Sequence, residues 1–289
     1  MQRADIVWEV TAWYAEHARD LPWRAADATP WGIMVSEFML QQTPVARVLE
    51  PWRQWLERWP TPAALAAVEP GDAVRAWGRL GYPRRAQRLH AAATAIVRDH
   101  GGEVPRDLAA LRALPGVGEY TAAAIASFAF GQRQVVLDTN VRRVLARLES
   151  GRAAPSPSLT TAERTQAERW LPDEPADAAR WAVAAMELGA QLCTATSPDC
   201  RACPVAGHCR WLAAGRPDNV PARRPQGYAG TDRQARGALL AVLREADAPV
   251  ARDNLLAAWT IDPEQARRAL DSLLADRLIH QVLPTHYQL

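Results

Sequence analysis

The chain has 289 residues, 48% of them hydrophobic, so it is long enough for two domains with packed cores. All 34 basic residues are arginines and the formal net charge is +2; this charge is too small to indicate nucleic-acid binding by itself, and the absence of lysine excludes catalysis through a lysine Schiff base. Because no apolar run reaches membrane-spanning length and the first residues lack the charged-then-apolar order of a signal peptide, we expect a soluble cytoplasmic protein.

Ala-rich and Leu-rich helical patterns recur along the chain and alternating β-branched runs are few, which predicts a mostly α-helical fold. Residues 1–150 read as short amphipathic helices separated by Pro and Gly. In this part Thr29 can cap a helix and Pro30 suits its first turn. Glu37 then lies among apolar residues of the segment "SEFMLQQT", with Gln41 one helical turn further on. An ionisable acid in a helix without a clean solvent face is unusual.

The segment "LRALPGVGEYTAAAIASFAF" (residues 111–130) reads as a helix end, a Pro-Gly turn and a second helix. Its glycines would let the N–H groups of Gly116, Val117 and Gly118 point outward near a helix N-terminus, which favours a phosphate. An ordinary helix hairpin is the alternative, and it is the commoner case.

Asp138 precedes the helical pattern that begins at Thr139. Most aspartates at such positions are only caps, but a cap and a catalytic role are compatible. We expect amide donors and the helix dipole to keep Asp138 ionised even in a dry cleft.

All four cysteines lie in one segment with the spacing C-x6-C-x2-C-x5-C: Cys193, Cys200, Cys203 and Cys209. Cytosolic proteins rarely keep structural disulfides, so the cluster predicts a metal site. Structural zinc and a [4Fe–4S] cluster are both held by four thiolates, and the spacing does not choose between them.

The segment 214–230 mixes Pro, Gly and Arg without periodicity and is predicted to be a linker, as 151–160 is predicted to be a loop. Three helical patterns follow the linker, and "LIHQVLPTHYQL" can form a hairpin: the helices are expected at about 232–246, 251–259 and 263–278. This order suggests a winged helix, which can contact DNA or pack against a partner domain.

Five motifs now identify a resemblance. In order they are "VSEFMLQQT", "RLGYPRRAQRLH", "LPGVGEYTA", "LDTNVRRVLAR" and "MELGAQLCT", and together they resemble the MutY-type adenine glycosylases of the helix-hairpin-helix (endonuclease III-like) superfamily over about residues 5–212. The resemblance implies an iron–sulfur cluster domain at 1–22 and 135–213 and a six-helix domain with the hairpin at 23–134. The linker predicted at 214–230 and the winged-helix-like module predicted at 231–289 follow them. The resemblance also implies that the four cysteines hold a [4Fe–4S] cluster that is structural and DNA-sensing.

The resemblance assigns roles to the residues singled out above. Glu37 matches the general acid that protonates adenine at N7, and Asp138 matches the carboxylate that stabilises the oxocarbenium-like sugar. Tyr120 and Asn140 match positions that line the cleft. Gln41, Gln42 and Tyr82 match the family residues that fill the gap in the duplex and wedge beside 8-oxoguanine.

The implied activity is hydrolysis of the glycosidic bond of adenine opposite 8-oxoguanine or guanine in double-stranded DNA, with the adenine flipped out of the duplex. Tyr120 stands where bifunctional relatives carry a lysine, so we expect no strand cleavage. We expect a nucleoid-associated monomer without a nucleotide cofactor and without a membrane partner.

Two departures from the family pattern concern the backbone beside Asp138 and the reading of the lesion. Thr139 replaces the glycine of the usual Asp-Gly-Asn, and the 59 residues from Thr231 to Leu289 are too few for the family's Nudix-like lesion-reading domain. A mismatch thymine or uracil glycosylase of the same superfamily therefore remains an alternative, as does a non-catalytic module that binds damaged DNA. The pairing of Glu37 with Asp138 argues against the last of these.

Overall fold

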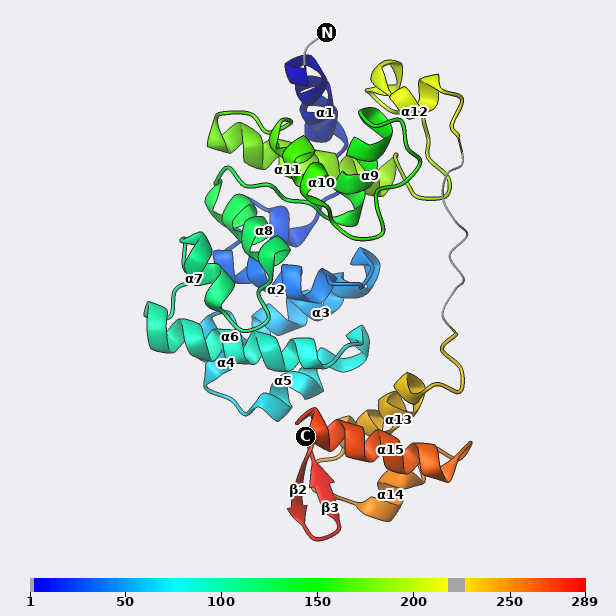
Figure 1. Cartoon of the computed structure of the whole chain (residues 1–289). Coiled ribbons are helices and arrows are strands. Elements are labelled where there is room, and N and C mark those ends of the chain that lie inside the picture. Colours follow the sequence, from blue (N-terminus) through cyan, green and yellow to red (C-terminus); the bar gives the residue numbers. More distant parts are fainter. Residues whose placement is uncertain (1–2, 218–226) are drawn as a thin grey trace. The chain divides into compact units, whose positions relative to one another are not determined.

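The computed structural model describes residues 3–217 and 227–289, and these form two compact units. Of the described residues, one unit takes 3–37, 105–113 and 117–217, and the other takes 38–104, 114–116 and 227–289. The mostly helical fold predicted from the sequence is confirmed (Figure 1). No helix in the described part of the chain is long and apolar enough to cross a membrane. The domain boundaries given by the resemblance stay a prediction.

The described residues of the first unit form helices joined by loops, without a strand. Its helices are α1 (Arg3–His17), η1 (Pro22–Arg24), α2 (Pro30–Leu40, whose last three residues belong to the other unit), α7 (Leu108–Ala113), α8 (Glu119–Phe130), α9 (Thr139–Leu148), α10 (Thr161–Glu168), α11 (Pro175–Gln191), η3 (Ala206–His208) and α12 (Arg210–Ala213). The predicted cap of α2 is present, since the Thr29 hydroxyl accepts a hydrogen bond from the Gly32 N–H at 3.0 Å.

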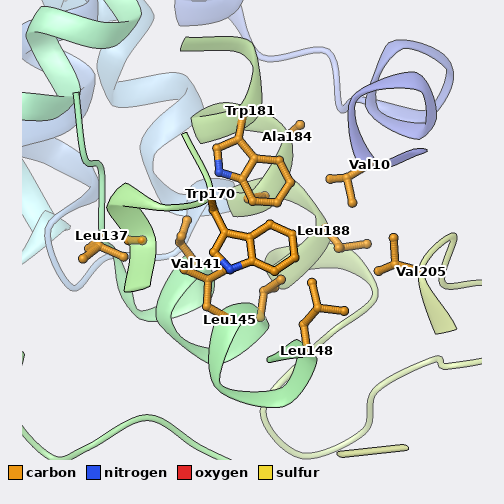
Figure 2. Close-up of a cluster of buried hydrophobic side chains, with 13 residues drawn as sticks. Val10, Leu137, Val141, Leu145, Leu148, Trp170, Trp181, Ala184, Leu188 and Val205 are labelled. Carbon is orange, nitrogen blue, oxygen red and sulfur yellow. The ribbon is translucent and has the colours of Figure 1, made fainter. Parts of the chain in front are cut away.

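Helices α1, α9 and α11 surround one apolar core (Figure 2). At its centre the rings of Trp170 and Trp181 stack with their centroids 5.7 Å apart and their planes within 13°. Val141 and Leu145 of α9 and Leu188 of α11 pack beside them. Because α9 begins directly after Asp138, this core fixes the helix whose N-terminus carries that aspartate.

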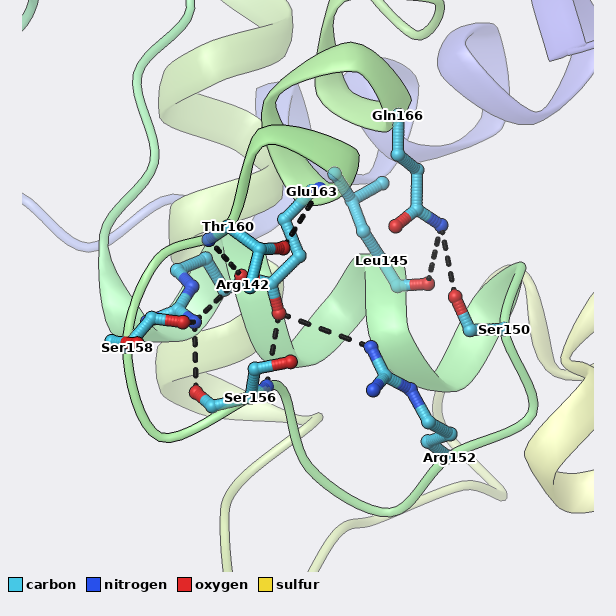
Figure 3. A network of polar contacts seen from close by, with 9 residues as sticks. All are labelled: Arg142, Leu145, Ser150, Arg152, Ser156, Ser158, Thr160, Glu163 and Gln166. Atoms are coloured by element: carbon cyan, nitrogen blue, oxygen red, sulfur yellow. Dashed lines mark hydrogen bonds and ion pairs between the residues drawn. The ribbon is translucent and has the colours of Figure 1, made fainter.

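A buried polar network holds the loop between α9 and α10 (Figure 3). Arg142 of α9 forms an ion pair with Glu163 at 2.7 Å and donates to the carbonyls of Ser156 and Ser158 at 2.8 and 2.9 Å. Glu163 also completes a capping box with Thr160. The predicted loop is therefore confirmed, and it is fixed by charge-assisted hydrogen bonds on its inner side.

The second unit contains the remaining helices and all described strands. Its helices are α3 (Val45–Arg58), α4 (Pro62–Ala66), α5 (Pro70–Trp77), η2 (Gly78–Leu80), α6 (Arg84–His100), α13 (Asp232–Glu245), α14 (Arg252–Leu256) and α15 (Pro263–Ala275). Trp55 meets Trp59 and Trp77 edge-to-face, with ring centroids 4.7 and 5.5 Å apart. These three buried indoles join α3 to α5.

The C-terminal part of this unit has the predicted three helices and hairpin. The hairpin is formed by β2 (His280–Leu283) and β3 (His286–Gln288), and α13 packs on α15 (Figure 1). A third strand, β1 (Val250–Ala251), pairs with β3 and gives the sheet order β1-β3-β2. The second helix is shorter than predicted: β1 takes Ala251, and the helix ends at Leu256. Most of the predicted linker, 218–226, lies outside the described residues.

Arg75 of α5 fastens the end of α13. Its Nη1 donates to the carbonyls of Leu243, Arg244 and Ala246 at 3.1, 2.6 and 2.9 Å. The last carbonyls of a helix have no partner within the helix, so a guanidinium there is favourable both as a donor and as a charge.

Candidate active site

Glu37 is a buried acid with an unusual pKa. Its side chain lies in α2 with 6% of its surface exposed. The pKa of Glu37 is raised to about 7, chiefly by burial; the Tyr120 hydrogen bond lowers it, the charge of Asp138 raises it and the charge of Arg24 lowers it. Close to neutral pH the protonated and ionised forms are therefore both populated.

Tyr120 connects α8 to this acid. Helix α8 begins directly after Gly118, which places Tyr120 in its first turn, where the side chain packs against an apolar cluster that includes Ala123 and Val136. The pKa of Tyr120 is raised well above 10 by burial and by the nearby charges of Glu37 and Asp138. The phenol consequently stays neutral and keeps a proton to share with Glu37.

Asp138 caps α9 as predicted. Its Oδ1 accepts from the Val141 N–H at 2.7 Å and its Oδ2 accepts from the Asn140 Nδ2 at 2.7 Å. Burial is the largest influence on the pKa of Asp138 and raises it, and the expectation that this carboxyl stays ionised remains a prediction. The bonds from Val141 and Asn140 and the charge of Arg143 lower it by less.

Asn140 is itself held by Arg143, one turn further along α9. The Arg143 Nη2 donates to the Asn140 Oδ1 at 2.8 Å and to the Gly189 carbonyl at 2.7 Å, and its Nε donates to the Cys193 carbonyl at 2.7 Å. Gly189 is required here, since a Cβ atom at that position would lie 2.7 Å from the Asn140 Cβ. Sequence reasoning missed Arg143, although its i+3 spacing from Asn140 was a usable signal.

The structure thus brings Glu37, Tyr120, Asp138 and Asn140 together within one unit. The charge of Asp138 raises the pKa of Glu37, and the hydrogen-bond partners of the two carboxyl groups differ. Glu37 is partly protonated near neutral pH, which suits a general acid. Asp138 receives hydrogen bonds beside it, which suits a carboxylate that stabilises positive charge.

The predicted hairpin is present between α7 and α8. Gly116 has φ +79°, and a Cβ atom there would lie 2.7 Å from the Arg88 Cβ and 2.9 Å from a Phe38 ring carbon. Val117 is buried, and Gly118 is the N-cap residue of α8. The turn therefore needs a glycine for its conformation and for its packing.

The three residues predicted to meet the duplex lie on two turns of the other unit. Gln42 is exposed in the turn after α2, which also contains Gln41, and Tyr82 is 49% exposed in the turn before α6. Gln42 and Tyr82 both have positive φ, +57° and +48°. A residue other than glycine rarely adopts a positive φ unless the surrounding structure enforces it.

The four cysteines are free thiols that lie near one another. Burial raises the pKa of Cys203 to about 11, and the other three cysteine thiols each raise it further. The Arg147 Nη1 donates to the Cys193 sulfur at 3.3 Å. In the described part of the chain, no three His, Cys, Asp or Glu side chains are placed to hold a metal ion. The donor set, four thiols beside a buried cation, is of the kind that binds iron–sulfur clusters.

Residues 35–170 match the model of the HhH-GPD superfamily of base excision DNA repair proteins. The adenine DNA glycosylase of Mycobacterium tuberculosis is 52% identical over 279 residues, covering 96% of this chain and 91% of that protein. Among solved structures, a thermostable thymine-DNA glycosylase has a TM-score of 0.65 at 25% identity, covering 73% of this chain and 97% of that one. Endonuclease III in a non-covalent complex with DNA has a TM-score of 0.62 at 23% identity, with 74% and 98% covered. The chain therefore belongs to the adenine DNA glycosylases of the HhH-GPD superfamily.

Proposed function

We propose that this DNA glycosylase removes adenine mispaired with 8-oxoguanine or guanine from double-stranded DNA and does not cleave the strand. The observation that carries the proposal is the pairing of buried Glu37 with half-buried Asp138, with Tyr120 bonded to Glu37. The 52% identity to an adenine DNA glycosylase over nearly the whole chain supports adenine as the base.

In the proposed reaction Glu37 is the acid. Adenine leaves poorly as an anion, so a proton delivered to its N7 lets the electron pair of the C1′–N9 bond leave with a neutral base. A carboxyl with a pKa of about 7 holds that proton near neutral pH and can still transfer it. The Tyr120 hydroxyl positions the carboxyl group.

Asp138 has the complementary role. As the bond to adenine breaks, positive charge develops on the sugar, and a carboxylate close to it lowers the energy of that state. The Val141 N–H, the Asn140 amide and the charge of Arg143 favour the ionised form of Asp138 against its burial. Water then bonds to C1′ through its oxygen and gives up a proton, which restores the acid form of Glu37, and an abasic site is left.

Two further surfaces are proposed to hold the DNA. The Gly116–Gly118 turn offers backbone N–H groups and the N-terminus of α8 to a phosphate. Gln41, Gln42 and Tyr82 are proposed to enter the duplex at the space left by the flipped adenine. Because Glu37, Tyr120 and Asp138 come from one chain, we propose that a monomer is active, which a measurement of molar mass during excision tests.

We also propose that Cys193, Cys200, Cys203 and Cys209 hold a [4Fe–4S] cluster. Their thiols lie close enough to raise the pKa of Cys203, and Arg147 lies beside the Cys193 sulfur to compensate negative charge. A bound cluster would supply structural cross-linking of this segment. The excision chemistry proposed above uses none of these residues.

Thymine opposite guanine is the second candidate substrate, because the fold matches a thymine-DNA glycosylase with a TM-score of 0.65. Single-turnover excision on otherwise identical duplexes carrying A:8-oxoG, A:G, T:G and U:G decides between the two. We expect adenine release from the first two duplexes, without strand cleavage until alkali is added. Thymine or uracil release with adenine retained would refute the proposal and establish the second candidate.

A further inference from the structure

Arg85 is a buried arginine that bonds to two separate turns of the second unit. It lies in the first turn of α6 with 5% of its surface exposed. Its Nη1 bonds to the segment that ends α2, and its Nη2 bonds to Thr43 and to the turn that precedes α6. Nothing in the proposed chemistry uses this residue.

The first set of bonds closes the end of α2. The Arg85 Nη1 donates to the carbonyls of Phe38 and Met39, both at 2.9 Å, and to the Gln41 carbonyl at 2.6 Å. Carbonyls at a helix C-terminus need an external donor, and a cation also complements the helix dipole there. Burial lowers the pKa of Arg85 to about 10, so the guanidinium is still charged at neutral pH.

The second set of bonds reaches the turn that contains Tyr82. The Arg85 Nη2 donates to the carbonyls of Gly81 and Leu80 at 3.0 and 3.4 Å. The same nitrogen donates to the Thr43 hydroxyl at 2.9 Å, and that hydroxyl donates to the Leu80 carbonyl at 3.3 Å. The guanidinium also lies 5.6 Å from the centre of the Tyr82 ring.

These bonds flank the two strained residues. Arg85 bonds to Gln41 and Thr43 on either side of Gln42, and to Gly81 directly before Tyr82. Gln42 and Tyr82 keep positive φ angles without being glycine, so the surrounding structure must enforce their conformation. One planar cation that bonds to both turns enforces both at once.

We propose that Arg85 is a positioning residue that locks the Gln41–Gln42 turn and the Tyr82 turn into one arrangement, so that both enter the duplex together. The inference rests on the proposed function of these two turns as the part that meets DNA. A lysine would keep the charge, but its ammonium group lacks the rigid planar fork that serves both turns. Arg85→Lys therefore separates the geometry from the charge, and Arg85→Met removes both.

The first measurement needs no substrate. Hydrogen exchange of the full-length protein, followed by mass spectrometry, should show the 41–43 and 80–83 segments losing protection together in Arg85→Lys and Arg85→Met. Arg98→Met is the matched control, since Arg98 lies on the same helix, is exposed and pairs only with its neighbour Asp99 among the contacts described. Loosening of one turn alone, or of neither, overturns the proposal.

The second measurement compares two duplexes below the melting temperature of every variant. With A:8-oxoG, single-turnover excision by Arg85→Lys should fall roughly ten- to a hundredfold, because misplacement by about 1 Å can have that effect. When adenine lies opposite an abasic-site analogue, no base pair has to be opened, so the excision rate of Arg85→Lys should fall clearly less. Equal losses on both duplexes, or parent-like excision despite two loosened turns, would overturn the positioning role.

The two arms also separate this inference from the proposed function. If the parent protein releases no adenine from either duplex, the proposed function fails, and the exchange experiment still decides whether Arg85 couples the two turns. If the parent protein is active and the turns loosen independently, only the inference about Arg85 fails.

Discussion

Replacing Glu37 with glutamine removes an acid and preserves the shape of the side chain. Duplex binding should stay close to that of the parent, since Glu37 is buried and the proposed phosphate and duplex contacts lie elsewhere. Adenine release should fall by about 10² to 10⁴, the usual contribution of a general acid, because glutamine cannot deliver a proton to N7.

The pKa of Glu37 sets the pH dependence of the parent. With a pKa of about 7, roughly half of the molecules carry the catalytic proton at pH 7 and about a tenth carry it at pH 8. The reactive form is the protonated one, so single-turnover excision should be full below the pKa and should fall about tenfold per pH unit above it.

Neighbouring substitutions should move this alkaline limb in opposite directions. Tyr120→Phe removes a hydrogen bond that lowers the pKa of Glu37, so the limb should shift to higher pH. Asp138→Asn removes a charge that raises the same pKa, so the limb should shift to lower pH, together with a loss of rate from the missing carboxylate. If Glu37 had only a structural role, neither substitution would shift the pH at which the excision rate begins to fall.

The assay is single-turnover release of adenine from an A:8-oxoG duplex at saturating enzyme, across pH values on both sides of 7, with binding measured in parallel. Parent-like release by Glu37→Gln would show that Glu37 is only a buried structural acid. A rate for the parent that does not fall above the pKa would refute the assignment of its proton to the reaction, even if Glu37→Gln were slow.

Three other outcomes follow from the described contacts. Glu187→Gln should lower the free energy of unfolding, measured with urea, by about 3–5 kcal/mol, because it breaks a buried pair with Arg19 and Arg24; less than 1 kcal/mol would contradict this. Since the pKa of Glu187 is lowered to about 2, its contribution should persist at neutral pH and be lost as the pH falls from about 4.5 towards 2. The purified protein should be yellow-brown with about four irons per chain, whereas a colourless, active, zinc-loaded protein would refute the cluster. Truncation after Pro225 should lower the melting temperature, because the bonds of Arg75 to α13 are lost, and an unchanged melting temperature would contradict that docking role.

What the sequence predicts well here is local. The Thr29 cap of α2, the Asp138 cap of α9 and the three C-terminal helices each depend on residues a few positions apart, and all are present. The two-residue strand β1 is too short for an alternating pattern, so sequence periodicity could not reveal it.

Contacts between distant segments could not be predicted in this way. Arg85 meets Gln41 across 44 positions, and nothing in its neighbourhood along the chain distinguishes it from Arg84. The upward pKa shift of Asp138 has the same origin, since it depends on how much of the fold covers a residue whose local hydrogen bonds favour the opposite direction.

The division of labour between Glu37 and Asp138 follows from where each lies on its helix. Inside α2 the backbone N–H groups are used by the helix itself, so a carboxyl group there can receive hydrogen bonds only from side chains such as Tyr120. At the start of α9 the N–H groups are unused, and Asp138 accepts one of them together with the Asn140 amide. Burial raises the pKa of both groups; Tyr120 offsets it at Glu37, whereas a backbone N–H, the Asn140 amide and the charge of Arg143 offset it at Asp138. A helix interior therefore suits the group that must hold a proton, and a helix N-terminus suits the group that must remain negative beside a cationic sugar.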